Sequence, residues 1–581
     1  MRNLLQMSDE YEITTSMRTD ELGLDSLVAV RIRSWFLNNY QVNIPALKIL
    51  QGVPLQEIID QALDALPETL LAAVVDSNEN SRSDENNACS SQQSVLAEST
   101  QTDTPPSTVP QSEDAFSADE LDIKHSPKGA AAPEIELKRF GPLSYAQSMF
   151  LFTHELLNDK TTVNNAALLH LRGELRIADL KRALEELTQH HEIMRTCFLM
   201  QEGQIVQGIM ASSPMTLEHK RIFNQTELFQ EYETLKNHVF DLRYGQTMRV
   251  MLLSHSPRDH YLIMAYHHIV FDRASIFPFM ADLERLYWGQ DIKESPLQYL
   301  DFSNDQHEQD ISGGWANAVN FWKSQFETIP EQLPLHRSKI SRRLPLQKYA
   351  SQTSELVIDI SISRKIRQLV RRLRSTPFHL YIAAYKVLLL RFLGVEDVCI
   401  GVADNFRREE KLQNAIGPFL NILPLRLAAN KEESCEEAIT DARDKILQAL
   451  AHSIPLGAIL KGVPGARNSS QSPLAQAFIN YSEDDSQDAG SFLGCETKML
   501  KHHEAEVAYD IAFTIVNGPG DTTRVSVNVQ DSLYLESDAL SLARNYEEIL
   551  QQFVTAPAQC TVDTRRYLES DLQRALTVGR G

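Results

Sequence analysis

Three pairs of adjacent histidines occur in the chain: His190-His191, His267-His268 and His502-His503. The middle pair follows an apolar run over residues 261–266, which predicts a buried strand, and it precedes a helical pattern that begins near Ile276. An imidazole at a turn between a strand and a helix can accept or donate a proton near neutral pH. His267 and His268, with Asp272 shortly after them, are therefore the first candidates for acid–base chemistry.

The residues alone leave other interpretations of this pair open. A structural, hydrogen-bonded pair of histidines is the main alternative. A metal site of two histidines and one carboxylate is less favoured, because adjacent side chains on a strand point to opposite faces. A Ser-His-Asp hydrolase is disfavoured, since the chain has no G-x-S-x-G motif. No metal site is predicted.

A serine near the start of the chain is the second candidate. Ser26 lies in the segment Glu21 to Leu27, where Gly23 permits a tight turn and the apolar spacing predicts a helix that starts at Asp25-Ser26. A hydroxyl at the positive end of a helix is a natural place for a phosphate ester. The same serine could also do no more than cap the helix.

Composition divides the chain into two patterned regions joined by a tether. Residues 1–70 and the residues from about 139 onward show helical and strand periodicity, whereas residues 71–138 are mostly polar. Within residues 76–133, eleven acidic side chains stand against three basic ones, which accounts for -8 of the net charge of -22. Such a stretch buries too little apolar surface to offset its ordering entropy. We therefore predict a disordered acidic linker over residues 71–138.

Charge and composition argue against several classes of protein. A net charge of -22 disfavours a nucleic-acid-binding protein, which needs a basic face. The six cysteines are scattered without a C-x-x-C pair, so they indicate reduced thiols, and we expect a cytoplasmic protein. The most apolar stretch, residues 381–393, is interrupted by Lys386 and Arg391, so no membrane span is predicted.

Residues 139–565 resemble the condensation domains of nonribosomal peptide synthetases, through several short motifs in the family's order. The central motif is His267-His268-Ile269-Val270-Phe271-Asp272, which resembles H-H-x-x-x-D-G. The other matching stretches are Leu143 to Gln147, His191 to Thr196, Tyr299 to Phe302, Ile400 to Arg407, Ile416 to Arg426 and Ser472 to Tyr481. The agreement of so many ordered motifs makes the resemblance specific.

This resemblance implies a fold and a set of roles for the site residues. We expect an α/β domain over residues 139–575, made of two chloramphenicol-acetyltransferase-like lobes in a V, with an N-lobe of about residues 139–310 and a C-lobe of about residues 311–575. A tunnel between the lobes would admit a carrier arm from each side. His268, with His267 beside it, would be catalytic. It would deprotonate or orient the amine of an aminoacyl thioester that attacks a polyketide thioester.

In the same resemblance, Asp272 would not touch the substrate. It would pair with Arg407 and hold the loop, because a buried carboxylate needs a charged partner.

Leu22 to Leu27, with the residues that follow it as far as Leu50, resembles the acyl carrier domain of fungal highly reducing polyketide synthases. The resemblance implies a small all-α helix bundle over residues 1–70, with phosphopantetheine attached to Ser26 by a phosphopantetheinyl transferase. Only 25 residues precede Ser26, so we expect part of the first carrier helix to be missing. The chain would then be a multidomain C-terminal fragment. Its partners would be upstream polyketide synthase domains and, if the protein continues beyond Gly581, adenylation and peptidyl carrier domains.

One residue departs from the condensation motif, because Arg273 stands where the family has glycine. A positive φ there would cost a non-glycine residue about 1–2 kcal/mol. The guanidinium could also compete with Arg407 for Asp272, or narrow the tunnel.

Two functions therefore remain in view. The first is amide formation, in which a polyketide chain on the carrier is transferred to an aminoacyl thioester in secondary-metabolite biosynthesis. The second is a module with altered or lost amide synthesis that serves product release or carrier docking, as in a lovastatin-type synthase.

Overall fold

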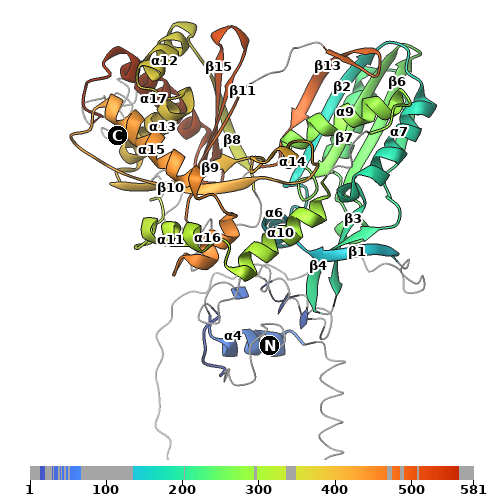
Figure 1. The fold of residues 1–581 in the computed structure, drawn as a ribbon, viewed down its shortest axis with the longest axis horizontal. Helices are drawn as coiled ribbons and strands as arrows, with labels where there is room; N and C mark the ends of the chain where they lie inside the picture. Colours follow the sequence, from blue (N-terminus) through green and yellow to red (C-terminus); the bar gives the residue numbers. More distant parts are fainter. Residues whose placement is uncertain are drawn as a thin grey trace, which may run out of the picture. The chain divides into compact units, whose positions relative to one another are not determined.

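The apolar runs of the sequence form the strands of two six-stranded sheets, and each sheet is the centre of one α/β lobe in the computed structural model (Figure 1). The structure describes residues 14–19, 53–66, 135–201, 203–292, 297–334, 349–466, 474–483, 490–506 and 509–561, together with scattered positions between 29 and 49. The two-lobed α/β fold predicted from the resemblance is confirmed.

The first sheet contains the strand that leads to His267. Its strand order is β12-β13-β2-β7-β6-β5, and only the edge pair β5 and β6 is parallel. The strands are β2 (Asn164–Arg172), β5 (Leu217–Arg221), β6 (Met248–Ser256), β7 (Asp259–His267), β12 (Gly490–Phe492) and β13 (Cys495–His503). The same part of the chain also forms a three-stranded sheet of order β1-β4-β3. Its strands are β1 (Leu137–Pro142), β3 (Thr196–Gln201) and β4 (Gln204–Met210).

Amphipathic helices cover this lobe. They are α6 (Tyr145–Leu156), α7 (Ile177–His190), α8 (Gln225–Lys236) and α9 (Ile276–Tyr287), with 3-10 turns η1 (Glu192–Arg195), η2 (Leu242–Tyr244) and η3 (Arg273–Ser275). A capping box at Ser144 and Gln147 fixes the start of α6. Helix α9 begins at Ile276, where the apolar spacing predicts a helix.

The second sheet has the order β10-β9-β11-β14-β15-β8. Its strands are β8 (Ser351–Ile358), β9 (Asp397–Asp404), β10 (Asn421–Ala428), β11 (Ala477–Glu483), β14 (Ile511–Asn517) and β15 (Thr523–Gln530). The helices of this half are α11 (Ala316–Gln325), α12 (Ile360–Arg372), α13 (Pro377–Leu393), α15 (Cys435–Ala451), α16 (Leu456–Gly462) and α17 (Glu536–Thr555), with the 3-10 turn η4 (Pro519–Asp521). Helices α10 (Tyr299–Ser312) and α14 (Glu410–Gln413) instead bury Tyr299, Phe302 and Leu412 in the core of the first lobe.

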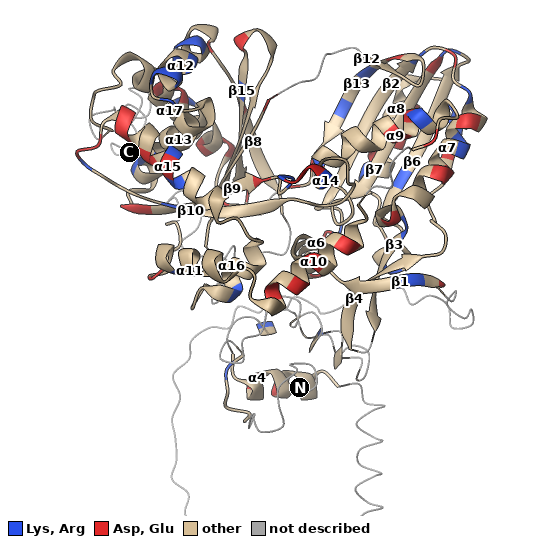
Figure 2. Ribbon diagram, in the orientation of Figure 1, with Lys and Arg blue, Asp and Glu red and all other residues tan. Residues whose placement is uncertain are grey.

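Charged residues avoid the middle of strands β2 and β7 in the first sheet and of β9 and β11 in the second. In β2, β7, β9 and β11 they occur only at the strand ends, while the helices carry most of the coloured segments in Figure 2. Helix α13 does bury a charged side chain, because its Lys386 pairs with Glu433 at 2.9 Å. Most of β2, β7 and β9, and the first half of β11, are thus buried on both faces by apolar packing.

Two segments from the second half of the chain pack in the first lobe. Strands β12 and β13 follow β11 in the sequence but pair with β2 of the first sheet, so residues 490–503 belong to the first lobe. Phe492 and Leu493 are buried in the first hydrophobic core, and so are Ile416 and Phe419 from the chain between β9 and β10. A division of the chain at about residue 310 therefore does not separate the lobes completely.

The N-terminal region is described only in part. Helix α4 (Leu55–Asp64) buries Leu55, Ile58 and Ala62, in agreement with the amphipathic pattern of this segment. Ser26 and the predicted linker as far as residue 134 lie outside the described residues. Among the helices of the described ranges, none combines the length and the apolar character of a bilayer span.

Candidate functional site

The two adjacent histidines sit where β7 ends and a turn begins. The backbone N–H of His267 donates to Thr247 O at 2.8 Å, and that of His268 donates to Val163 O at 3.0 Å. Both rings contact helix α6, although adjacent side chains on a strand point to opposite faces. They can do so because the strand ends at His267 and His268 already belongs to the turn.

The ring of His267 is fully buried, and both of its nitrogens are engaged. Its Nδ1 accepts a hydrogen bond from the backbone N–H of Ile269 at 3.1 Å. The proton is therefore on Nε2, which donates to Nδ1 of His154 at 3.2 Å. Burial lowers the pKa of His154 to about 4 and holds the pKa of His267 well below its ordinary value. The ring of His267 is therefore neutral near pH 7, and its expected direct role in catalysis stays a prediction.

His268 is the partly exposed member of the pair. Its ring stacks on Phe150 of α6, with the centroids 4.4 Å apart and the planes 16° apart. Its Nδ1 is buried and has no hydrogen-bond partner among the described residues. Burial lowers the pKa of His268, and the carboxylates of Asp272 and Glu504 act in the opposite direction. The ring is thus neutral near pH 7 and can accept a proton.

Asp272 holds the loop that follows His268. Its side chain caps η3 by accepting hydrogen bonds from Ser275 N at 2.8 Å and Ser275 Oγ at 2.7 Å. Its second oxygen accepts from the backbone N–H of Phe419 at 3.1 Å. Asp272 is 6% exposed, so its charge needs these donors and a cation.

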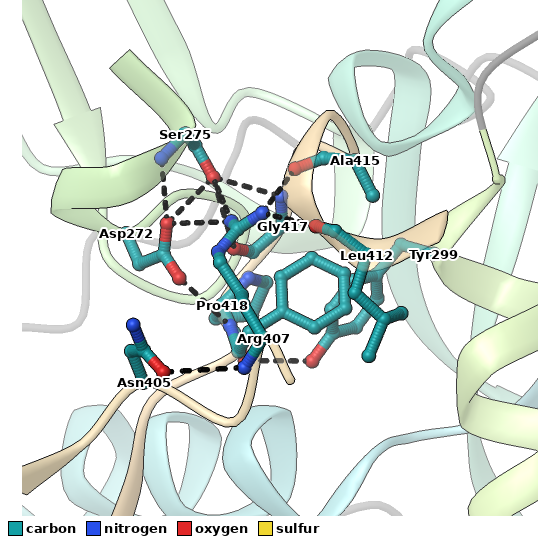
Figure 3. A network of polar contacts seen from close by, with 10 residues as sticks. Asp272, Ser275, Tyr299, Asn405, Arg407, Leu412, Ala415, Gly417 and Pro418 are labelled. Atoms are coloured by element: carbon teal, nitrogen blue, oxygen red, sulfur yellow. Dashed lines mark hydrogen bonds and ion pairs between the residues drawn. The ribbon is translucent and has the colours of Figure 1, made fainter. Parts of the chain in front are cut away.

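Arg407 supplies that cation from the chain that follows β9 (Figure 3). Its Nη2 donates to Asp272 Oδ1 at 2.9 Å, and its Nη1 donates to the backbone oxygens of Leu412 at 2.7 Å and Ala415 at 2.6 Å. The guanidinium also stacks on Phe419, 4.2 Å from the ring centroid. The structure therefore brings Asp272 and Arg407 together across the two lobes, and removal of either one would leave a buried charge unpaired.

Arg273 turns away from this pair. Arg273 begins η3 and is not among the described non-glycine residues with positive φ, so its backbone is not strained by a left-handed conformation. Its Nη1 donates to Glu504 Oε1 at 2.9 Å, and Arg407 alone of the two arginines contacts Asp272 in the described chain. Arg273 therefore does not displace Arg407.

A comparison with protein-family models finds the condensation-domain model over residues 138–577. The chain belongs to the condensation-domain family. Curated proteins similar to the chain include the polyketide synthase-nonribosomal peptide synthetase phmA of Phaeosphaeria nodorum, which is 33% identical over 100% of this chain and 16% of that protein. Another is the hybrid PKS-NRPS synthetase pydA of an Acremonium species, 32% identical over 100% of this chain and 14% of that protein. The chain thus spans about one sixth of the length of these relatives.

Solved condensation domains have the same fold. The condensation domain of the monacolin K polyketide synthase MokA aligns with a TM-score of 0.65 and 22% identity, over 73% of this chain and 100% of that one. The X-domain from teicoplanin biosynthesis aligns with a TM-score of 0.63 and 23% identity, over 75% of this chain and 99% of that one. At these identities the likeness concerns the fold.

Several residues around the site of this condensation domain could not be identified from the sequence. Phe150 and His154 lie on α6, more than a hundred residues before the histidine pair, and Glu504 follows β13 far beyond it. Ser275 had a local signal, because an Asp followed three residues later by a hydrogen-bonding residue is typical of a helix start. In the described part of the chain, His, Cys, Asp and Glu side chains form no group of three that could hold a metal ion.

Proposed function

We propose that this condensation domain transfers an acyl chain from a carrier-bound thioester to an amine and so forms an amide. In this reaction the amine nitrogen attacks the thioester carbonyl, the C–N bond forms and the C–S bond breaks. One proton leaves the amine, and the departing thiolate takes one up. The observation that supports the proposal is the state of His268, which is neutral, partly exposed and held by its backbone at the end of β7.

His268 takes the proton of the attacking amine in this scheme and returns it to the departing thiolate. Asp272 and Arg407 keep the loop in place without touching the substrates. Much of the rate enhancement comes from holding both tethered substrates together, which makes the reaction nearly intramolecular.

The donor in this proposal is a polyketide chain on the phosphopantetheine arm of Ser26, which a phosphopantetheinyl transferase installs. Upstream polyketide synthase domains build that chain, and a peptidyl carrier loaded by an adenylation domain presents the amine. The reaction takes place in the cytoplasm. The sequence resemblance of Leu22 to Leu27 to fungal acyl carriers and the hybrid nature of the relatives support this assignment.

A single-turnover assay tests the proposal. The chain is loaded at Ser26 with an acyl group and mixed with an aminoacyl thioester, and amide formation is followed by mass spectrometry. We expect the His268→Ala variant to lose about 10²–10⁴-fold in rate, the usual contribution of a general base. The Ser26→Ala variant controls for loading, because it should gain no arm and give no product.

Equal rates in the wild type and in His268→Ala would contradict the catalytic role of His268. A wild type that binds the loaded carrier but forms no amide would instead favour the docking or product-release function.

A further inference from the structure

Glu504 lies beside the histidine loop, on the segment that crosses from one lobe to the other. The backbone N–H of Ala505 donates to Asn165 Oδ1 at 3.0 Å, and that of Glu506 donates to Thr162 O at 3.0 Å. On the other side of the same stretch, the His268 N–H donates to Val163 O at 3.0 Å. Residues 162–165 thus separate Glu504 from the histidine turn by two strand spacings, about 10 Å along the sheet.

The carboxylate of Glu504 forms an ion pair with Arg273 of the histidine loop, and the same oxygen lies 3.6 Å from Nδ1 of His502. Arg273 Nη1, which lies five residues after His268, donates to Glu504 Oε1 at 2.9 Å. Glu504 also acts electrostatically on His268, because its charge favours the protonated ring. The ion pair thus links Glu504 to the loop that carries the proposed base.

The Arg273–Glu504 ion pair can be exchanged. Its side chains are 57% and 48% exposed. A pair this exposed contributes at most about 1 kcal/mol, because water and salt screen it. A second cation that reaches the carboxylate can therefore take the place of Arg273 at little cost.

An amine acceptor brings such a cation. A free α-amino group has a pKa of about 7.7–8.0, so most of it arrives as ammonium at neutral pH. An ammonium must bind and lose a proton before its nitrogen can attack. A carboxylate on the segment beside the histidine turn attracts the cation. The bound ammonium then loses one proton to solvent, and His268 takes the second proton as the nitrogen attacks the thioester.

We propose that Glu504 binds the ammonium group of the acceptor in exchange for Arg273 and so selects amines over neutral nucleophiles. This inference rests on the proposed function, because it names the acceptor-binding residue of the same site. Before the acceptor arrives, Arg273 keeps the carboxylate oriented. Glu504 is then a specificity residue, whereas His268 remains the proton acceptor.

Equilibrium binding tests this inference without turnover. Glycinamide and glycolamide carried on pantetheine differ only in an amine against a hydroxyl, and neither is a thioester. We expect the wild type to bind the amine up to about fivefold more tightly than the hydroxyl compound, as an exposed ion pair of about 1 kcal/mol allows, and Glu504→Gln to lose this preference. The hydroxyl compound should bind both proteins alike. Glu496→Gln is the matched control, because Glu496 is an exposed glutamate on β13, the strand that precedes Glu504, and makes no described side-chain contact.

Two results would overturn the proposal. One is an amine preference in Glu504→Gln equal to that of the wild type. The other is an equal loss of affinity for both compounds, which would show a structural role only. The His268→Ala variant separates this inference from the proposed function, because it should keep the amine preference while it loses transfer. If it transfers at the wild-type rate, the role of His268 fails and the binding data still decide that of Glu504.

Discussion

Two neighbouring histidines reach different chemical states in this domain because different groups surround their rings. His267 has a donor on one nitrogen and an acceptor on the other, so its ring can neither gain nor lose a proton without breaking a buried hydrogen bond. His268 stacks on a phenyl ring, and its buried Nδ1 has no hydrogen-bond partner in the part of the chain that the structure describes. The first ring is therefore bound to His154 of α6, whereas the second is partly exposed.

The His154–His267 contact predicts a pH-dependent stability. The pKa of His154 is about 4 in the folded chain and about 6.5 when unfolded, so its contribution to stability is complete above pH 6.5 and is lost as the pH falls toward 4. Between pH 7.5 and pH 5 this loss is about 2 kcal/mol. Urea unfolding followed by tryptophan fluorescence should show a smaller loss in His154→Gln, because glutamine does not titrate.

His190→Gln is the matched control for that experiment. His190 ends α7 and is exposed, so the variant should keep the full pH dependence of the wild type. An identical pH dependence in His154→Gln and the wild type would contradict the neutral His154–His267 pair.

At the scale of single residues, the sequence could locate His268 and Asp272, because strand, turn and helix signals follow one another in one short stretch. It could not locate His154 or Glu504 as neighbours of that stretch. Their proximity depends on how α6 packs and on the register of β13 against β2. Neither property has a local signal in the chain.

At the scale of elements, the loop between α14 and β10 joins the second lobe to the histidine loop. The N–H of Gly417 donates to Ser275 Oγ at 3.0 Å, and Ser275 in turn donates to Asp272. Tyr299 packs against this loop, and its hydroxyl donates to Pro418 O at 2.8 Å. These hydrogen bonds therefore connect the loop, and through it the second lobe, to Asp272.

Gly417→Ala should break this connection. A Cβ at residue 417 would overlap Cδ2 of Tyr299, whose ring is fully buried and held through its hydroxyl. The loop must shift, and we expect a loss of about 2–4 kcal/mol in unfolding free energy together with slower transfer. Gly490→Ala controls for the change itself, because a Cβ there meets no atom within 4 Å. Equal melting temperatures for the two variants would rule out the tight contact.

The periodicity of apolar residues predicted the helices and the buried strand β7 well, since α9 and β7 lie where the spacing indicates. It could not predict that β12 and β13 join the first sheet. A strand pattern shows which face is buried but not which sheet receives the strand, and the partner β2 lies more than three hundred residues earlier. The lobe boundaries are therefore a property of the folded chain.

At the scale of the whole molecule, this crossover predicts that the lobes do not fold as separate pieces. Without residues 490–503, strand β2 becomes an edge of the sheet. Its buried residues, such as Ala167 and Leu169, then become accessible to solvent. An exposed apolar edge strand promotes aggregation. We expect a fragment of residues 136–334 to aggregate or to lack a cooperative melting transition, and a fragment of residues 136–561 to be monodisperse in size-exclusion chromatography. Co-expression of 136–334 with 349–561 should restore a soluble complex, because the second piece supplies β13. A soluble, cooperatively folded 136–334 fragment would show that the first sheet does not need the crossover strands.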